Sequence, residues 1–380
     1  MARNLLLLVL SLASLAFARK CQDFVVEVDL SAQNVVFNLE TPKTNIDVTN
    51  YITNMAKHSV NYAESISTGT TTVKGKYELQ ATYCEPDSGP SKVLQILTHG
   101  IAFDRKYWDL PFNNYNYSYV KTAVDDFGFS TITYDRLGLG QSSHGDPISE
   151  IQASLELDAL RALTEKLRGG KIPKLAKKAF DKFVHVGHSF GSILSYSLTV
   201  ENPALSDGLI LTGFTQYGNY VPYFLLGSAF VQANSRKELR DYANGYIAPG
   251  VASAVQLTFF APGQFDPKIL DLAFKTGQPA TPGELLTLGG LTGSPNPFTG
   301  PVLVITGNAD LPFCGGDCSS TGNPCQDSYL DISAGTFKEA SPFEAYVVPG
   351  AGHGLALEYS HVETTGKMLD FLTQNGLAGK

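Results

Sequence analysis

The fold is constrained most by short, continuous apolar runs that alternate with longer segments of helical spacing. A strand that is apolar along its whole length is buried on both faces, as in a parallel sheet covered by helices. The pattern therefore predicts an α/β fold around a mostly parallel sheet. From residue 93 onward the runs are VLQILT (93–98), STITYD (130–135), FVHVG (183–187), GLILTG (208–213), VLVITG (302–307) and AYVV (345–348).

The segments around these runs predict the remaining elements. Apolar residues recur at helical spacing from Ile148 to Leu167, and two glycines then end the pattern. A last helix is predicted from about Glu358 to Asn375. Residues 23–38 and 72–84 instead alternate between apolar and polar, which predicts an antiparallel edge of the sheet.

About 85 residues between Gly213 and Pro301 interrupt the alternation of strands and helices. They include long apolar stretches at 220–231 and 251–265, and we expect a small helical cap over the carboxyl edge of the sheet. The predicted divisions are a leader (1–18), a first part of the core (19–215), the cap insertion (216–300) and a second part of the core (301–380).

The leader has the features of a secretory signal peptide. Arg3 precedes LLLLVLSLASLAFA, and small residues at 16 and 18 predict cleavage before Arg19. No later stretch of 18 apolar residues exists, so we expect a secreted chain with no membrane span. The net charge of -8, with no basic stripe, disfavours nucleic acid and anionic membranes as partners, and no obligate protein partner is evident.

Secretion makes disulfides possible for the five cysteines. Cys21 and Cys84 each lie beside a strand-like segment and could join the two. Cys314, Cys318 and Cys325 crowd into one loop, where a zinc site would lack a fourth ligand, so a disulfide is favoured. The sequence also holds one glycosylation sequon, NYS, which begins at Asn116.

The sequence GHSFG at 187–191 stands between a predicted strand and a predicted helix. Five such residues alone could form an ordinary strand-to-helix connection, but the motif and its context together favour a catalytic Ser189. This context is also the one that a nucleophile elbow requires, with Ser189 as nucleophile and glycines where side chains would collide. Activation of a serine needs a histidine base and a carboxylate that orients it.

In enzymes with such an elbow the acid and then the base follow the nucleophile along the chain. His353, just past the last strand, is the favoured base, while His361 is expected at the surface. Asp310 follows the strand 302–307 closely and is the favoured acid. Asp317, Asp327 and Asp331 are the later alternatives in the same connection.

A developing oxyanion needs two N–H donors. Phe190, directly after the nucleophile, would supply one, and Ile101, after His99 and Gly100, the other, with Ala102 next. His99 has no partner ligands at metal-binding spacing, so no metal site is predicted. The sequence DRLGLGQSS at 135–143 lacks the third glycine of a dinucleotide loop, and a tight turn explains it.

Five motifs in this order resemble the α/β-hydrolase superfamily, in particular its secreted, cap-bearing members of fungal type. The resemblance implies an eight-stranded, mostly parallel sheet with helices on both faces, a triad of Ser189, Asp310 and His353, and no cofactor. Relatives that are dehalogenases or epoxide hydrolases have Asp at the elbow, whereas this chain has Ser. The motifs are HG (99–100), DRLGLGQS (135–142), GHSFGS (187–192), ITGNAD (305–310) and GAGHG (350–354).

These residues together predict a secreted serine hydrolase that cleaves a carboxylic ester, lactone or thioester of a small apolar molecule. A lyase or biosynthetic enzyme with the same triad, an aminopeptidase, and a non-catalytic binding module remain alternatives. The apolar stretches of the cap are expected to line the substrate pocket as well as the cap's own core. The candidate pocket residues are Tyr223, Phe224, Phe259 and Phe260.

Overall fold

The six apolar runs form the parallel part of one eight-stranded sheet in the computed structural model, which describes residues 19–323 and 326–380. The predicted signal peptide and Cys325 lie outside the described residues. The sheet order is β1-β2-β4-β3-β5-β6-β9-β10. The parallel strands are β3 (Val93–Thr98), β4 (Ser130–Tyr134), β5 (Lys182–His188), β6 (Gly208–Thr212), β9 (Val302–Gly307) and β10 (Phe343–Val348).

The antiparallel edge is a long two-stranded ribbon of β1 (Lys20–Phe37) and β2 (Ser67–Glu85), and β2 then pairs antiparallel with β4. Buried and exposed residues alternate along most of β1, as expected for a strand with one face on the core. Cys21 lies opposite Cys84 in the register, and the two form a disulfide.

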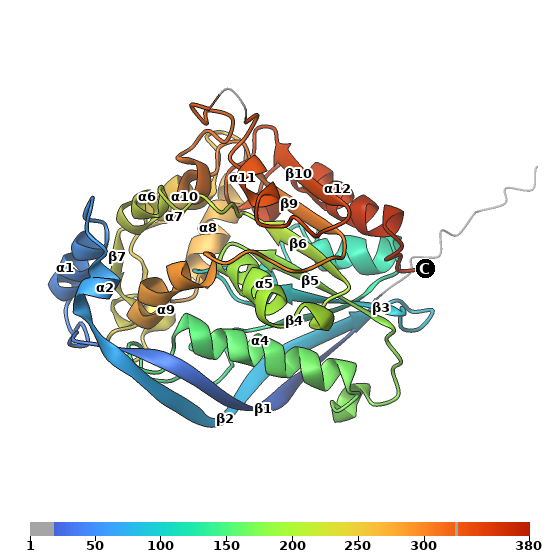
Figure 1. Ribbon diagram of the computed structural model, residues 1–380, viewed down its shortest axis with the longest axis horizontal. Coiled ribbons are helices and arrows are strands. Elements are labelled where there is room, and N and C mark those ends of the chain that lie inside the picture. Colours follow the sequence, from blue (N-terminus) through green and yellow to red (C-terminus); the bar gives the residue numbers. More distant parts are fainter. Residues whose placement is uncertain (1–18, 324–325) are drawn as a thin grey trace, which may run out of the picture.

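Helices cover both faces of the sheet (Figure 1). α4 (Ala153–Arg168) and α5 (Phe190–Glu201) lie side by side on one face. On the other face lie α12 (His361–Gln374) and the helical segment that begins with α3 (Tyr119–Lys121) and continues as a π-helical turn through Asp126.

The predicted start of α4 at Ile148 is wrong, because competing hydrogen bonds hold residues 148–152 outside the helix. The carboxylate of Asp146 accepts from the N–H groups of Ile148 and Ser149. The side-chain amide of Gln152 accepts from the N–H of Val35 and donates to its carbonyl, which ties the segment to β1.

The elements between β6 and β9, which we call the cap, include a small antiparallel sheet as well as the expected helices. In this sheet β7 and β8 are paired antiparallel, with Phe230 opposite Pro249 and Gln232 opposite Ile247. The cap elements are α6 (Val221–Gly227), β7 (Phe230–Gln232), β8 (Ile247–Pro249), α7 (Ala252–Phe259), α8 (Pro267–Thr276) and α9 (Pro282–Thr287).

The two strands of the ribbon are connected by a long segment, residues 38–66, which we call the excursion. It holds α1 (Asn45–Met55) and α2 (Tyr62–Ile66), and Figure 1 shows α1 beside β7. The Tyr51 hydroxyl donates to the carbonyl of Pro282 at 3.0 Å, and the N–H of Gln232 donates to Asn45 Oδ1 at 2.8 Å. The excursion is therefore attached to the cap, an arrangement that the sequence analysis did not anticipate.

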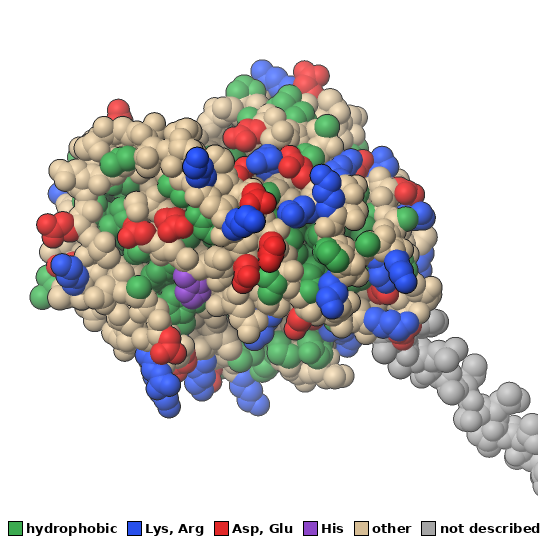
Figure 2. All heavy atoms as spheres, turned by 90° about the horizontal axis from the view of Figure 1, so that it is seen from below, with side chains coloured by type: hydrophobic (Ala, Val, Ile, Leu, Met, Phe, Trp, Pro, Cys, Tyr) green, Lys and Arg blue, Asp and Glu red, His purple; other side chains and the backbone are tan. Residues whose placement is uncertain are grey.

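Two short helices, α10 (Leu311–Cys314) and α11 (Asp331–Ala334), lie between β9 and β10. Within residues 19–323 and 326–380, no helix has the length and apolar character needed to cross a membrane. On the face seen in Figure 2, acidic and basic side chains are interspersed rather than gathered by sign.

Candidate active site

Ser189 occupies a strained turn between β5 and α5, with φ 54° and ψ -117°. A Cβ on Gly187 would lie 2.5 Å from Gly191 O and from two backbone atoms of Ser192. A Cβ on Gly191 would lie 2.1 Å from Thr98 O. The turn therefore requires glycine on both sides of the serine, which is the steric reason expected for a nucleophile elbow.

Asp310 and His353 form a buried hydrogen-bonded pair. His353 Nδ1 lies 2.8 Å from Asp310 Oδ2, and the two side chains are at most 1% exposed. Asp310 also accepts from the Thr306 hydroxyl at 2.5 Å and from the N–H of Phe313 at 2.9 Å. Asp310 Oδ2 thus lies where it can accept a hydrogen bond from the Nδ1–H tautomer of His353.

The pairing uses Nδ1 of His353, and the buried Nε2 atom has no hydrogen-bond partner among the described residues. The His353 ring lies 4.9 Å from the ring of His188, the residue directly before Ser189. The N–H of Ser189 donates to Thr212 O at the end of β6. Serine, acid and base thus follow three parallel strands at the same edge of the sheet.

The alternative acids have other contacts. Asp317 and Asp327 are exposed, and Asp317 accepts from Ser319. Asp331 accepts from the N–H of Ser328.

The other histidines near the site are buried. His188 stacks on Tyr107 with 4.3 Å between ring centroids, and burial lowers its pKa well below the usual range. The prediction that His361 lies at the surface is wrong, because Tyr117 covers it at a ring distance of 4.1 Å. His361 Nδ1 also lies 2.8 Å from Glu358 O.

The two expected oxyanion donors lie at the first residue of α5 and in the loop after β3. Phe190 is the first residue of α5, so its N–H has no acceptor within the helix. A Cβ on Gly100 would lie 2.8 Å from Ser189 Cβ, so the chain before Ile101 passes close to the serine. Gly100 O faces His99 Nδ1 at 2.8 Å and Arg136 Nη2 at 3.4 Å. In a trans peptide the C=O of one residue and the N–H of the next point in opposite directions, so the Ile101 N–H points away from the His99 ring and the Arg136 side chain.

A buried ionic cluster that was not predicted from the sequence contacts this loop through Gly100 O. Arg136 Nη1 donates to Glu156 and to Glu284 of the cap, each at 2.5 Å, and all three side chains are 1% exposed. Burial, more than any partner, raises the pKa of Glu156 well above the usual range. The guanidinium also lies 4.6 Å from the centroid of the Phe190 ring. Arg136 stands in the motif DRLGLGQS, but nothing local in that motif identifies its distant partners.

Residues 95–364 match the sequence profile of the alpha/beta hydrolase family. The chain belongs to this family.

Solved structures show the same fold at low identity. This chain is similar to a thermophilic esterase from Thermogutta terrifontis, with 19% sequence identity and a TM-score of 0.53, over 79% of this chain and 94% of that one. An enol-lactonase from Burkholderia xenovorans is 16% identical with a TM-score of 0.53, over 78% of this chain and 97% of that one. A bromoperoxidase from Bacillus anthracis is 16% identical with a TM-score of 0.51, over 79% of this chain and 96% of that one. These likenesses establish a fold that hosts several reactions. No curated protein matches the sequence.

Glu358 of this alpha/beta hydrolase, like the ionic cluster around Arg136, was not predicted from the sequence. Its fully buried carboxylate accepts from the N–H of Gly352, next to His353, at 2.6 Å, and from that of Ala261 in the cap at 2.5 Å. Burial raises its pKa to about 7, although both amide hydrogen bonds oppose the shift. Glu358 thus joins the histidine loop to the cap.

The four aromatic residues proposed for the hydrolase's pocket lie in different surroundings. The Phe259 ring is 5.6 Å from the His353 ring and 5.9 Å from the Phe224 ring. Phe260 packs on Phe265, and Tyr223 is 52% exposed.

The loop after the candidate acid is closed by a disulfide between Cys314 and Cys318. The N–H of Cys314 donates to Asp310 O at 3.1 Å, so the disulfide begins at the helical turn that carries the acid. On the opposite flank, Asn116 of the predicted sequon is exposed in the turn before α3.

Proposed function

We propose that the chain is a secreted serine hydrolase that cleaves a carboxylic ester through an acyl-enzyme. The observation that carries the proposal is the buried Asp310–His353 pair, whose Nε2 has no partner in the described part of the chain, beside the strained turn of Ser189. An unprotonated Nε2 can take the serine proton, and serine is a weak nucleophile without such a base. Catalytic hydrogen bonds are often long before substrate binds.

In this mechanism Ser189 Oγ attacks the ester carbonyl carbon while its proton passes to His353 Nε2. The N–H groups of Ile101 and Phe190 stabilise the oxyanion, and Asp310 stabilises the imidazolium. The intermediate collapses as the carbon–oxygen bond to the alcohol breaks, and the alcohol leaves with the proton from Nε2. Water then attacks the acyl-enzyme by the same steps, which releases the acid and restores Ser189.

Secretion is supported by the leader sequence and by two disulfides among the described residues, Cys21–Cys84 and Cys314–Cys318. Disulfides of this kind persist in oxidising compartments. The ester substrate is supported by the apolar surroundings of the site, which include the rings of Phe259 and Phe313, each within 5.7 Å of the His353 ring.

The test is turnover of a p-nitrophenyl ester panel by the secreted chain. Ser189→Ala should lower kcat by roughly 10⁴- to 10⁶-fold with unchanged circular dichroism. Asp310→Asn should cost less, because a misoriented imidazole still acts occasionally. Asp327→Asn, an exposed carboxyl in the same connection, is the matched control. Retained activity in folded Ser189→Ala, or a larger loss in Asp327→Asn than in Asp310→Asn, would contradict the proposal.

A further inference from the structure

Two cavities of the hydrolase adjoin each other between the cap and the excursion. The inner one has a volume of about 300 Å³ and the outer one about 510 Å³. They share four lining residues, so they form one groove with an inner and an outer chamber. The shared residues are Asn61, Ala63, Leu286 and Gly289.

The inner chamber lies beside the candidate active site, although Ser189, Asp310 and His353 are not among the residues that line it. Ile193 lines it and lies one helical turn after Ser189 on α5. Phe313 also lines it, donates its N–H to Asp310, and has its ring 5.7 Å from the His353 ring. Two residues of the lining are thus neighbours of the candidate nucleophile and the candidate acid.

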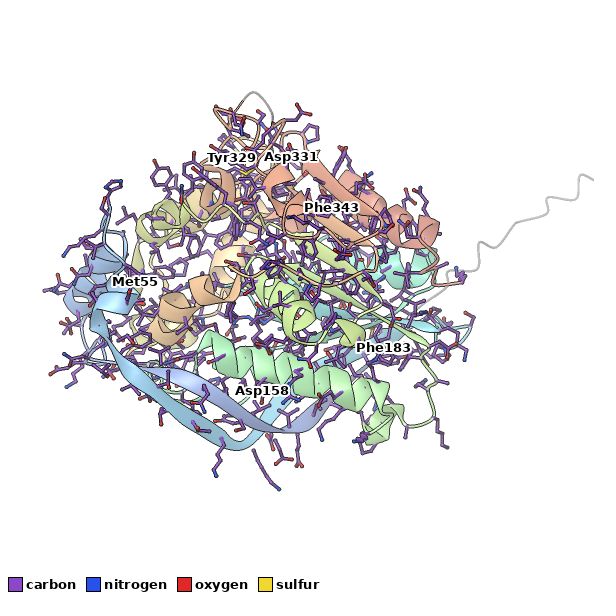
Figure 3. The ribbon with its side chains drawn as sticks, in the orientation of Figure 1. Met55, Asp158, Phe183, Tyr329, Asp331 and Phe343 are labelled. Carbon is purple, nitrogen blue, oxygen red and sulfur yellow. A yellow bond between two sulfur atoms is a disulfide. The ribbon has the colours of Figure 1, made fainter. Side chains whose placement is uncertain are left out.

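The walls of the groove come from two parts of the chain that are far apart in sequence. Leu285 and Leu286 of α9 form the cap wall, and Met55 and Ala63 belong to the excursion wall. Figure 3 labels Met55 at the end of α1, on the side of the molecule where the cap lies. The outer chamber continues to Val35 and Phe37 at the end of β1.

The chemistry of the lining favours a hydrocarbon. Among the described residues, none that lines the inner chamber is charged, and Glu64 is the only charged one that lines the outer chamber. The remaining lining is apolar with some neutral polar residues, such as Asn61 and Gln216. Glu64 lies at the start of α2, where its N–H donates to Asn61. Chambers of these volumes lie in the range of small-ligand sites.

We propose that the groove binds an extended hydrocarbon limb of the ester, and that the excursion, together with the cap, sets the length of limb accepted. This inference rests on the proposed function and enlarges it, because the substrate is then longer than the small molecule expected from sequence. Each methylene that enters the groove should raise kcat/KM by about fourfold when fully desolvated.

Three glycines allow the groove to be blocked at defined depths. A Cβ on Gly289, Gly290 or Gly293 meets no atom within 4 Å, and none of the three has a positive φ. Gly289 lines both chambers, Gly290 lines the outer chamber, and Gly293 lines neither. Gly289→Phe should block both chambers, Gly290→Phe the outer one, and Gly293→Phe is the matched control.

The excursion wall is tested separately by Ala63→Leu, which adds bulk at the junction of the chambers. Ser65→Leu adds a similar side chain to the same short helix, at an exposed position that lines neither chamber.

The measurement is the ratio of kcat/KM for p-nitrophenyl decanoate to that for p-nitrophenyl acetate, repeated with alkyl acetates to distinguish an acyl limb from an alcohol limb. In the series that uses the groove, Gly289→Phe and Ala63→Leu should lower the ratio of long to short ester by about tenfold or more. Gly290→Phe should lower it only for the longest limbs. Gly293→Phe and Ser65→Leu should keep the wild-type ratio.

A binding measurement separates failure of the groove from failure of the proposed reaction. Ser189→Ala should bind p-nitrophenyl decanoate, and adding Gly289→Phe should weaken that binding by about tenfold. If no ester is turned over while this difference in binding persists, the reaction is wrong and the groove stands. If folded Gly289→Phe and Ala63→Leu keep the wild-type ratios and affinity, the groove proposal is overturned.

Discussion

At the scale of single residues, Glu358 shows how burial couples protonation to stability. Its pKa is raised to about 7, mainly by burial, with the nearby charge of Asp310 adding to the shift. Between pH 4.5 and about 7 the folded chain therefore retains a proton that the unfolded chain has lost. Ionisation of Glu358 thus lowers the stability of the fold as pH rises through this window.

We expect Glu358→Gln to remove this dependence. Although the variant loses one amide hydrogen bond, its unfolding free energy relative to wild type should rise by up to about 3 kcal/mol from pH 4.5 to 7. Urea unfolding at intervals of pH measures the difference. Glu363→Gln, at an exposed position on α12, is the control and should follow wild type. Parallel profiles for Glu358→Gln and wild type would exclude the coupling.

At the scale of elements, the two disulfides serve different purposes. Cys21–Cys84 closes a sequence separation of 63 residues across the β1–β2 ribbon, whereas Cys314–Cys318 closes only 4. A long closed loop restricts the unfolded chain more than a short one does. The short disulfide begins four residues after the candidate acid, so we expect its main effect to be on the position of Asp310.

Replacing the cysteines in pairs by serine should separate these effects. Cys314→Ser with Cys318→Ser should lower kcat, by up to about 10²-fold if Asp310 moves by about 1 Å. Cys21→Ser with Cys84→Ser should leave kcat nearly unchanged and lower the unfolding free energy by up to about 4 kcal/mol. Steady-state kinetics and urea unfolding measure both pairs, and equal losses of kcat would refute the assignment.

Elements governed by local pattern were predictable from sequence, and those governed by distant partners were not. The run VLVITG forms β9 with the predicted bounds, since a strand in which nearly every residue is apolar is expected to be buried on both faces. The excursion helix α1 had a local signal, a capping box between Thr44 and Asp47, which the sequence analysis did not use. Arg136 and Glu284 are 148 residues apart, and no pattern along the chain indicates that they meet.

At the scale of the whole molecule, the cap is attached to the core through buried polar contacts. Arg136 on the core side meets Glu284 on α9, and Glu358 near the carboxyl end of β10 meets Ala261 after α7. A buried charge whose partner is removed is strongly destabilising, so these contacts resist separation of the cap. The position of the cap over the site is thereby linked to the stability of the fold.

Arg136→Met should lower the unfolding free energy by about 3–5 kcal/mol, because it leaves two carboxylates buried without their cation. Adding Glu156→Gln and Glu284→Gln should recover part of the loss, since no carboxyl group is then buried without its cationic partner. Arg240→Met, whose side chain is 71% exposed, is the control and should change stability by about 0.5 kcal/mol or less. The ion cluster would be unimportant to stability if Arg136→Met unfolded like wild type.

The pairing of β1 with β2 runs from Lys20 opposite Glu85 to Phe37 opposite Ser67, where the excursion leaves and rejoins the ribbon. Its two ends are thus neighbours, and the cost of closing a longer or shorter loop between such ends changes slowly with length. Descendants of this gene could therefore exchange or resize the segment without disturbing the strands that carry the reacting groups. Substrate range could then diversify at this position while the chemistry is inherited intact.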